Sequence, residues 1–192
     1  MHELGQKRQR RPKDRRDLRD IQSHALDEQS PFAVAPRARS HYVRPMKIAL
    51  ASDHAAFGLK GELAQWLREL GHDVTDLGPD GIESVDYPDY GYKLARYVAA
   101  GEADFGIAAC GSGIGISIAV NRVPQARCAL VSEPLSARLA REHNDANVIA
   151  LGARLVGLDM AKACVEAFLA TPFAGDRHVR RVEKLSRTPQ DA

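Results

Sequence analysis

The chain has 192 residues, of which 44% are hydrophobic and 27% are charged, and its formal net charge at pH 7 is +2. This length and apolar content suffice for one domain with a sizeable core. No apolar run approaches the roughly 20 residues that span a bilayer, and the first residues contain no apolar secretory segment, so we expect no membrane partner.

The charge is unevenly divided along the chain. Residues 1–45 hold 11 of the 27 Lys and Arg residues but 6 of the 25 Asp and Glu residues. This segment is polar and lacks sustained periodicity, so we expect a disordered, Arg-rich extension before a single domain over residues 46–192. We take Met46 as the natural start and expect no nucleic-acid partner; the alternative is an extension that binds nucleic acid or a membrane surface. An organelle transit peptide is disfavoured by Asp14, Asp17 and Asp20.

From residue 47 onward, short apolar runs alternate with runs of helical spacing. The alternation predicts an α/β protein with a three-layer, doubly wound (Rossmann-like) parallel sheet of about five strands, covered by helices on both faces. Ligands bind beyond the carboxyl ends of the strands in such sheets. A polar helix over residues 176–185 follows as an extra C-terminal element. The predicted strands are 47–52, 73–77, 105–109, 127–131 and 148–151, and the other predicted helices are 59–70, 90–100, 114–120, 134–142 and 158–169.

The three cysteines form no C-x-x-C pair and have no zinc-type spacing. This usage is typical of a reducing cytoplasm, which is the location we expect. Cys128 lies in a strand-like run and Cys164 in a helix-like run, so we expect both to be core residues. We predict no metal and no cofactor.

Residues 104–122, D-F-G-I-A-A-C-G-S-G-I-G-I-S-I-A-V-N-R, contain the strongest functional signal. A glycine-rich turn between a buried strand and a covered helix leaves several backbone N–H groups facing one point, which attracts an oxyanion or a phosphate. Cys110 and Ser112 lie at this turn, and the sequence therefore predicts a site there. The alternative is that the glycines only allow close packing and that Cys110 is a small core residue.

Two common phosphate-binding patterns do not fit this turn. The dinucleotide pattern would need a glycine where the chain has Ile116, and no Gly-Lys-Ser/Thr follows to make a P-loop. The turn therefore belongs to neither class.

Five linked motifs indicate a family. They are A-S-D-H-A-A-F-G-L-K (51–60), D-Y-P-D-Y (86–90), C-G-S-G-I-G-I-S-I-A-V-N-R (110–122), S-E-P-L-S-A-R-L-A-R-E-H-N-D-A-N (132–147) and D-R-H-V-R-R-V (176–182). Together they closely resemble the B-type ribose-5-phosphate isomerases and their galactose- and allose-6-phosphate isomerase relatives. The resemblance covers residues 46 to about 186 and none of the preceding extension.

The resemblance implies a metal-independent aldose–ketose isomerase that interconverts D-ribose 5-phosphate and D-ribulose 5-phosphate in the pentose phosphate pathway. An allose- or galactose-6-phosphate isomerase is the alternative; the galactose enzymes commonly work as paired non-identical chains. A phosphosugar-binding module without catalysis is the third hypothesis. The resemblance also implies a homodimer, or a tetramer, whose active site is shared across the subunit interface.

The reaction needs ring opening, removal of a proton from C2, stabilisation of the enediolate and return of the proton to C1. A thiol beside free N–H groups is favoured as thiolate, and both this argument and the resemblance make Cys110 the general base. The family's second branch uses a Glu six residues later, where this chain has Ile116. The anion hole would consist of backbone donors from Gly111, Ser112, Gly113, Ile114 and Gly115.

The remaining site residues follow from the resemblance. His143 is the acid/base for ring opening, Ser112 helps to move protons between sugar oxygens, and Asn144 binds a sugar hydroxyl. Helix capping is the alternative role for both Ser112 and His143. Sugar hydroxyls are expected to contact Asp53 and Tyr87, and the phosphate is expected to bind Arg154, Arg177 and Arg181, with His54 and His178 nearby.

Overall fold

A computed structural model of the chain describes residues 44–187, and the predicted extension over residues 1–45 lies almost wholly outside them. The described chain contains a five-stranded parallel sheet with the strand order β2-β1-β3-β5-β4, which confirms the predicted class. The strands are β1 (Lys47–Ser52), β2 (Asp73–Asp76), β3 (Phe105–Cys110), β4 (Cys128–Leu130) and β5 (Val148–Gly152).

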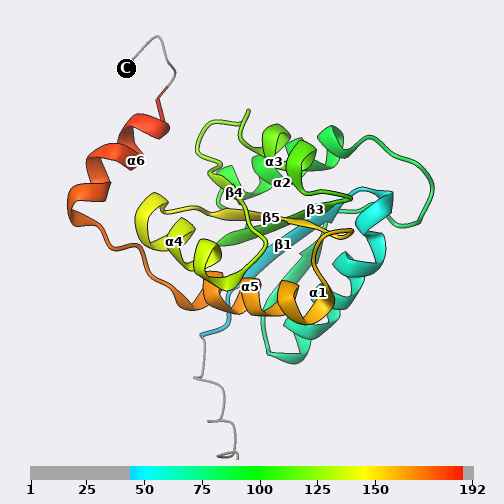
Figure 1. The fold of residues 1–192 in the computed structure, drawn as a ribbon. Helices are drawn as coiled ribbons and strands as arrows, with labels where there is room; N and C mark the ends of the chain where they lie inside the picture. Colours follow the sequence, from blue (N-terminus) through cyan, green and yellow to red (C-terminus); the bar gives the residue numbers. More distant parts are fainter. Residues whose placement is uncertain (1–43, 188–192) are drawn as a thin grey trace, which may run out of the picture. The chain divides into compact units, whose positions relative to one another are not determined.

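Helices cover both faces of this sheet (Figure 1). One face carries α1 (Phe57–Glu69), α4 (Pro134–Asn144) and α5 (Leu158–Ala170), and the other carries α2 (Tyr87–Ala99) and α3 (Ile114–Val120). Successive side chains of a strand point to opposite faces. Accordingly, β1 sends Ile48 and Leu50 into the first core and Ala49 and Ala51 into the second.

The small residues on the second face allow α2 and α3 to approach closely. A Cβ built on Gly91 of α2 would lie 2.8 Å from the Cβ of Ala119 in α3, so a side chain at residue 91 would push the helices apart. This close packing places the start of α2, and with it Tyr87, beside the glycine-rich turn that precedes α3.

The loop between β2 and α2 is fastened at its first residues. The buried Lys60 donates from Nζ to Asp76 Oδ1 (2.6 Å) and to the carbonyl of Pro79 (2.8 Å), while Lys93 donates to the carbonyl of Leu77 (2.8 Å). Because these lysines come from helices on opposite faces of the sheet, the loop leaves the end of β2 in a fixed direction.

The structure differs from the predicted elements at several helix boundaries; α4, for example, ends at Asn144 rather than at residue 142. Helix α2 begins at Tyr87 rather than at residue 90, with a proline in its first turn. The predicted helix over 176–185 consists of a 3-10 turn, η2 (Asp176–His178), and α6 (Val179–Leu185). Both Gly175 (φ 66°) and Asp176 (φ 49°) have positive φ, which prevents a regular helix from starting earlier.

Two cysteines lie away from the glycine-rich turn, Cys128 on strand β4 and Cys164 in helix α5. Cys164 is fully buried as predicted, whereas Cys128, on the edge strand β4, is partly exposed. Burial raises the pKa of both thiols, and the charge of Glu133 raises that of Cys164 further. Among residues 44–187, no helix combines the length and the apolar character needed to cross a membrane.

Candidate active site

A hollow of about 670 Å³ opens at the carboxyl ends of β1, β3 and β5, where ligands of doubly wound proteins bind. We call it the strand-end hollow. The turn after β3 contributes Cys110, Gly111, Ser112, Ile114 and Gly115 to its lining.

Four other predicted site residues reach the same hollow from other elements. They are Asp53 and His54 after β1, Tyr87 at the start of α2 and Arg154 after β5. Nine of the residues singled out from the sequence therefore lie together around one space, although they come from four separate segments of the chain.

Cys110 ends β3 and lies at the base of the strand-end hollow with 4% of its surface exposed. Its Sγ accepts a hydrogen bond from the Gly113 N–H (3.1 Å), so the sulfur already has one donor that favours a negative charge. Gly113 can make this turn because it adopts a left-handed conformation (φ 77°), and a Cβ there would lie 2.6 Å from Leu130 Cδ1.

Backbone donors surround the thiol. Within the described chain, the N–H groups of Gly111, Ser112 and Gly115 form no hydrogen bond, which leaves them free for a ligand. The Ile114 N–H donates to Ser112 Oγ (3.3 Å), so the hydroxyl caps α3 while remaining on the wall of the hollow. The turn can therefore stabilise an oxyanion through main-chain hydrogens.

Two glycines of this turn make room for side chains that arrive from elsewhere. A Cβ on Gly111 would lie 3.3 Å from Cζ of Arg154, whose guanidinium lies against the turn. A Cβ on Gly115 would lie 2.6 Å from the ring of Tyr87. The glycines thus bring a cation and a phenol to the same group of backbone donors.

The segment after β1 supplies a carboxylate and an imidazole. Asp53 is buried, and its Oδ1 accepts from the Ala56 N–H (3.1 Å), which fixes the side chain at the edge of the hollow. His54 Nδ1 accepts from the Val85 N–H (3.2 Å). An acceptor at Nδ1 places the proton of a neutral imidazole on Nε2, where it can be donated to a ligand oxygen.

Apart from Gly113, whose N–H donates to the Cys110 sulfur, the remaining five predicted site residues form a second group, away from the strand-end hollow. His143 and Asn144 are in the last turn of α4, Arg177 and His178 are in η2, and Arg181 is in α6. The rings of His143 and His178 stack with centroids 4.5 Å apart and planes 7° apart, and both arginines are exposed.

The two groups lie beyond opposite ends of the parallel strands. In the register of β3 and β5, Cys110 pairs with Gly152 and Gly106 pairs with Val148, which follows α4 after a short turn. Four residue steps of strand span about 13 Å, so Cys110 and His143 of one chain are separated by most of the length of a strand. Figure 1 shows α6 beyond one end of the strands, while the strand arrows point toward the other.

Sequence reasoning missed three residues that line the strand-end hollow, namely Ala55, Ile118 and Leu155. Ile118 is 59% exposed and Leu155 is 69% exposed, and together with the exposed Ile114 they surround the opening with apolar surface. The spacing of Ile114 and Ile118 by four residues could have revealed this face of α3. Exposed apolar side chains that cluster in this way mark an interaction surface.

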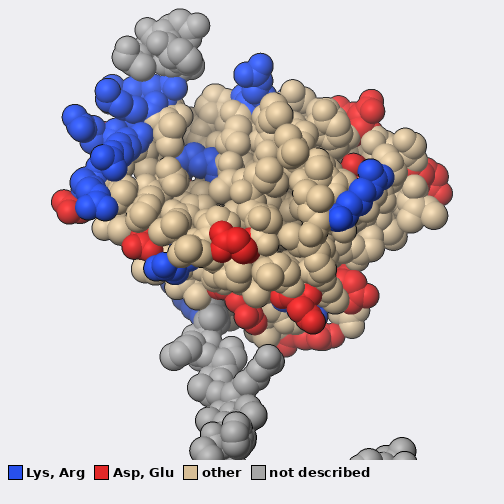
Figure 2. Space-filling view, viewed as in Figure 1, with Lys and Arg blue, Asp and Glu red and all other residues tan. Residues whose placement is uncertain are grey.

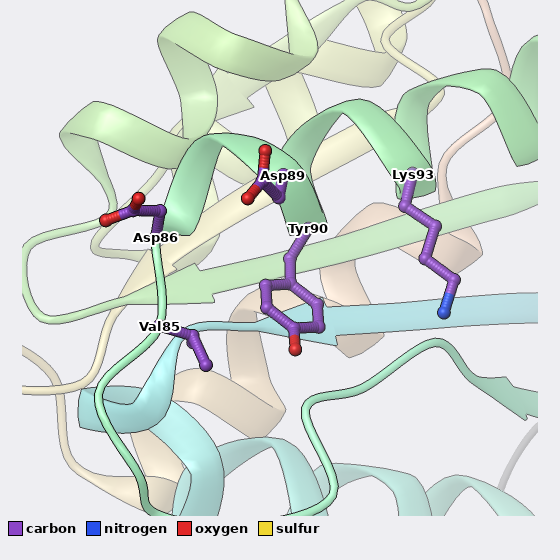
Figure 3. A pocket seen from close by; sticks show the side chains of 5 residues that line it. All are labelled: Val85, Asp86, Asp89, Tyr90 and Lys93. Carbon is purple, nitrogen blue, oxygen red and sulfur yellow. The ribbon is translucent and has the colours of Figure 1, made fainter.

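Another hollow, of about 410 Å³, lies beside α2 and is lined by Val85, Asp86, Asp89, Tyr90 and Lys93. Figure 3 shows that the two carboxylates point away from Tyr90 and Lys93. The Lys93 ammonium already donates to the Leu77 carbonyl. The polar groups of this second hollow do not point toward one another, so it is a weaker candidate site than the strand-end hollow. Within residues 44–187, no cluster of three or more His, Cys, Asp or Glu side chains could hold a metal ion.

The fold is that of the doubly wound α/β proteins, and the strand-end hollow lies where such proteins bind their ligands. The model of the family described as ribose/galactose isomerase matches residues 48–185. The chain belongs to this family.

The match to relatives of known sequence and structure covers nearly the whole length of each relative. Ribose-5-phosphate isomerase B of Escherichia coli (strain K12) is 47% identical over 144 residues, covering 75% of this chain and 97% of the relative. The solved ribose 5-phosphate isomerase of Thermotoga maritima is 49% identical, with a TM-score of 0.74, and covers 76% of this chain and 100% of its own. The Clostridium thermocellum ribose-5-phosphate isomerase B structure is 51% identical, with a TM-score of 0.73, and covers 73% of this chain and 95% of its own.

Proposed function

We propose that the protein is an aldose–ketose isomerase that interconverts D-ribose 5-phosphate and D-ribulose 5-phosphate. The observation that carries the proposal is the Cys110 thiol beside free backbone N–H groups and Arg154 in one hollow. These are the groups that removal of a proton next to a carbonyl requires, namely a base, donors for the enediolate and a cation for the phosphate. The names of the relatives point to the same substrate.

In this proposal, Cys110 takes the proton from C2 of the open-chain aldose and returns it to C1. The charge that develops on the sugar oxygens is stabilised by the free N–H groups of Gly111, Ser112 and Gly115. The Ser112 hydroxyl moves a proton between the two oxygens, while Asp53 and Tyr87 hold sugar hydroxyls. These groups lie on the lining of the strand-end hollow, which supports their assignment to one substrate. The proposal requires no metal.

The other half of the site comes from the second group. His143 moves a proton from the anomeric hydroxyl to the ring oxygen, Asn144 binds a sugar hydroxyl, and Arg177 and Arg181 bind the phosphate together with Arg154. Figure 2 shows basic side chains gathered over α6, which favours an anion there. Because the two groups of one chain lie beyond opposite ends of its strands, a complete site needs a second chain.

We therefore propose a homodimer in which each strand-end hollow is completed by His143 and the arginines of the partner subunit. The exposed Ile114, Ile118 and Leu155 around the hollow support this assembly, because apolar side chains of this size are buried in stable homodimers. The cytoplasm is the proposed location, since the cysteines of the described chain are all free thiols.

The sugar is tested by comparing kcat/KM on ribose 5-phosphate, allose 6-phosphate and galactose 6-phosphate. We expect the highest value on ribose 5-phosphate and values on the hexose phosphates that are lower by roughly 10- to 200-fold, because a pocket discriminates one extra carbon only modestly. A higher value on either hexose phosphate would establish the alternative isomerase. Binding of all three sugars without any conversion would establish a phosphosugar-binding module.

The domain proposal, with residues 46–192 as the isomerase, has its own test. A chain starting at Met46 is expected to keep the circular-dichroism spectrum, melting temperature and kcat/KM of the full chain, because the family match begins at residue 48. Loss of kcat/KM with an unchanged spectrum would mean that the extension takes part in catalysis. A lower melting temperature would mean that it belongs to the fold.

A further inference from the structure

The C-terminal arm, residues 171–187, returns to the last turn of α4 and is held there by two contacts. The Ala174 N–H donates to the carbonyl of Glu142 (3.0 Å), and His178 stacks on His143. Helix α6 continues directly from η2 and buries none of its side chains. The position of the arginines on this arm relative to α4 therefore depends largely on these two contacts.

His178 contacts side chains from both α4 and the C-terminal arm. It is 7% exposed, and its Nε2 accepts a hydrogen bond from Nε of the exposed Arg177 (3.3 Å). Burial lowers the pKa of His178, and the positive charges of His143, Arg177 and Arg181 lower it further, against the opposing effect of Glu142. A lowered pKa favours the neutral ring, and a neutral ring with its proton on Nδ1 can accept at Nε2.

We propose that His178 is a positioning residue that joins the ring-opening group to the phosphate-binding group. Its ring fixes the plane of His143 by stacking, and its Nε2 fixes the guanidinium of Arg177. The inference rests on the proposed function, in which His143 opens the sugar ring and Arg177 binds the phosphate. One buried imidazole then sets the spacing between two groups that must contact different parts of the same substrate.

Two variants separate the two contacts. His178→Phe keeps an aromatic ring for stacking but offers no acceptor, whereas His178→Gln keeps an acceptor but offers no ring. For His178→Phe we expect KM for ribose 5-phosphate to rise about fivefold, the effect of one lost hydrogen bond, with kcat close to that of the wild type. For His178→Gln we expect kcat on ribose 5-phosphate to fall about tenfold, because the acid/base is no longer held in one orientation.

A substrate that has no ring tests which step His178 supports. In erythrose 4-phosphate the C4 oxygen is esterified, so the five-membered ring cannot close and no ring opening is needed. We expect kcat of His178→Gln on this four-carbon aldose to match that of the wild type, while His178→Phe raises KM for both sugars. Equal losses of kcat on both sugars, or unchanged kinetics in both variants, would overturn the positioning role.

A measurement without turnover keeps this inference separate from the proposed function. Stacked rings shift each other's proton resonances upfield, so the His143 ring protons in the NMR spectrum should move downfield in His178→Gln, where no ring remains, and stay upfield in His178→Phe. The same His143 resonances in the wild type and in His178→Gln would contradict the positioning role. A wild-type enzyme inert toward both sugars would contradict the proposed function instead, whatever the spectra show.

Discussion

Replacing Cys110 with alanine is expected to lower kcat on ribose 5-phosphate by at least about two orders of magnitude, the usual contribution of a general base. The sulfur accepts from the Gly113 N–H at 3.1 Å and lies beside free backbone donors. Alanine removes the only group of this turn that can take a carbon-bound proton. We expect KM to change little, because the proposed site binds the phosphate through arginines rather than through the thiol. The readout is ribulose 5-phosphate formation at saturating substrate.

Cys128→Ala is the matched control for this substitution. It removes another thiol from the same protein, on the edge strand β4 and outside the strand-end hollow, and burial raises the pKa of that thiol. We expect kcat within about twofold of the wild type, as for surface and edge substitutions that touch no ligand. Full activity in Cys110→Ala, with an unchanged circular-dichroism spectrum, would transfer the role of base to another group.

Mixed dimers of two inactive chains are expected to regain activity. A general acid or base must lie within hydrogen-bond reach of the proton it transfers, and about 13 Å of strand keeps Cys110 and His143 of one chain apart. If each site takes the thiol from one chain and the imidazole from the other, a dimer of Cys110→Ala with His143→Ala contains one intact site. An equal mixture forms half of its dimers in this combination, so about a quarter of the wild-type activity should return.

The control pairs two substitutions from the same half of the site. Cys110→Ala and Arg154→Ala both affect the strand-end hollow, so every site of their mixed dimer lacks one group and no activity should return. Co-expression with two affinity tags isolates the mixed dimers, and sedimentation reports their mass. Recovery in the control pair, or none in the first pair, would contradict the shared site; a monomer with full activity would contradict it as well.

Local pattern predicted most of the fold. The strand over 47–52 and the helix over 114–120 have the bounds expected from their apolar runs. The start of α2 was predicted three residues late, because D-Y-P-D also suits a loop, whereas the helix begins at Tyr87 with a proline in its first turn. The strand order could not be predicted, since pairs such as β3 with β5 join residues distant in sequence.

The sequence predicted one group of site residues better than the other, again because some contacts join residues that are distant along the chain. Residues that directly follow a parallel strand must lie at one edge of the sheet, so the grouping of Cys110 with Asp53 and Arg154 follows from the strand pattern. The place of His143 depends on how far α4 runs back along the sheet. The contact of His143 with His178 depends on the path of the chain after α5, which no local pattern encodes.

The turns after β3 and β5 touch so closely that a Cβ on Gly152 would lie 2.6 Å from the Ser112 carbonyl oxygen. This contact joins main-chain atoms, which are the same whatever residues mutation introduces elsewhere. The shape of the opening is set instead by side chains such as Ile118 and Leu155. A lineage built on this plan can change the length of the sugar it admits while its proton chemistry stays as it was.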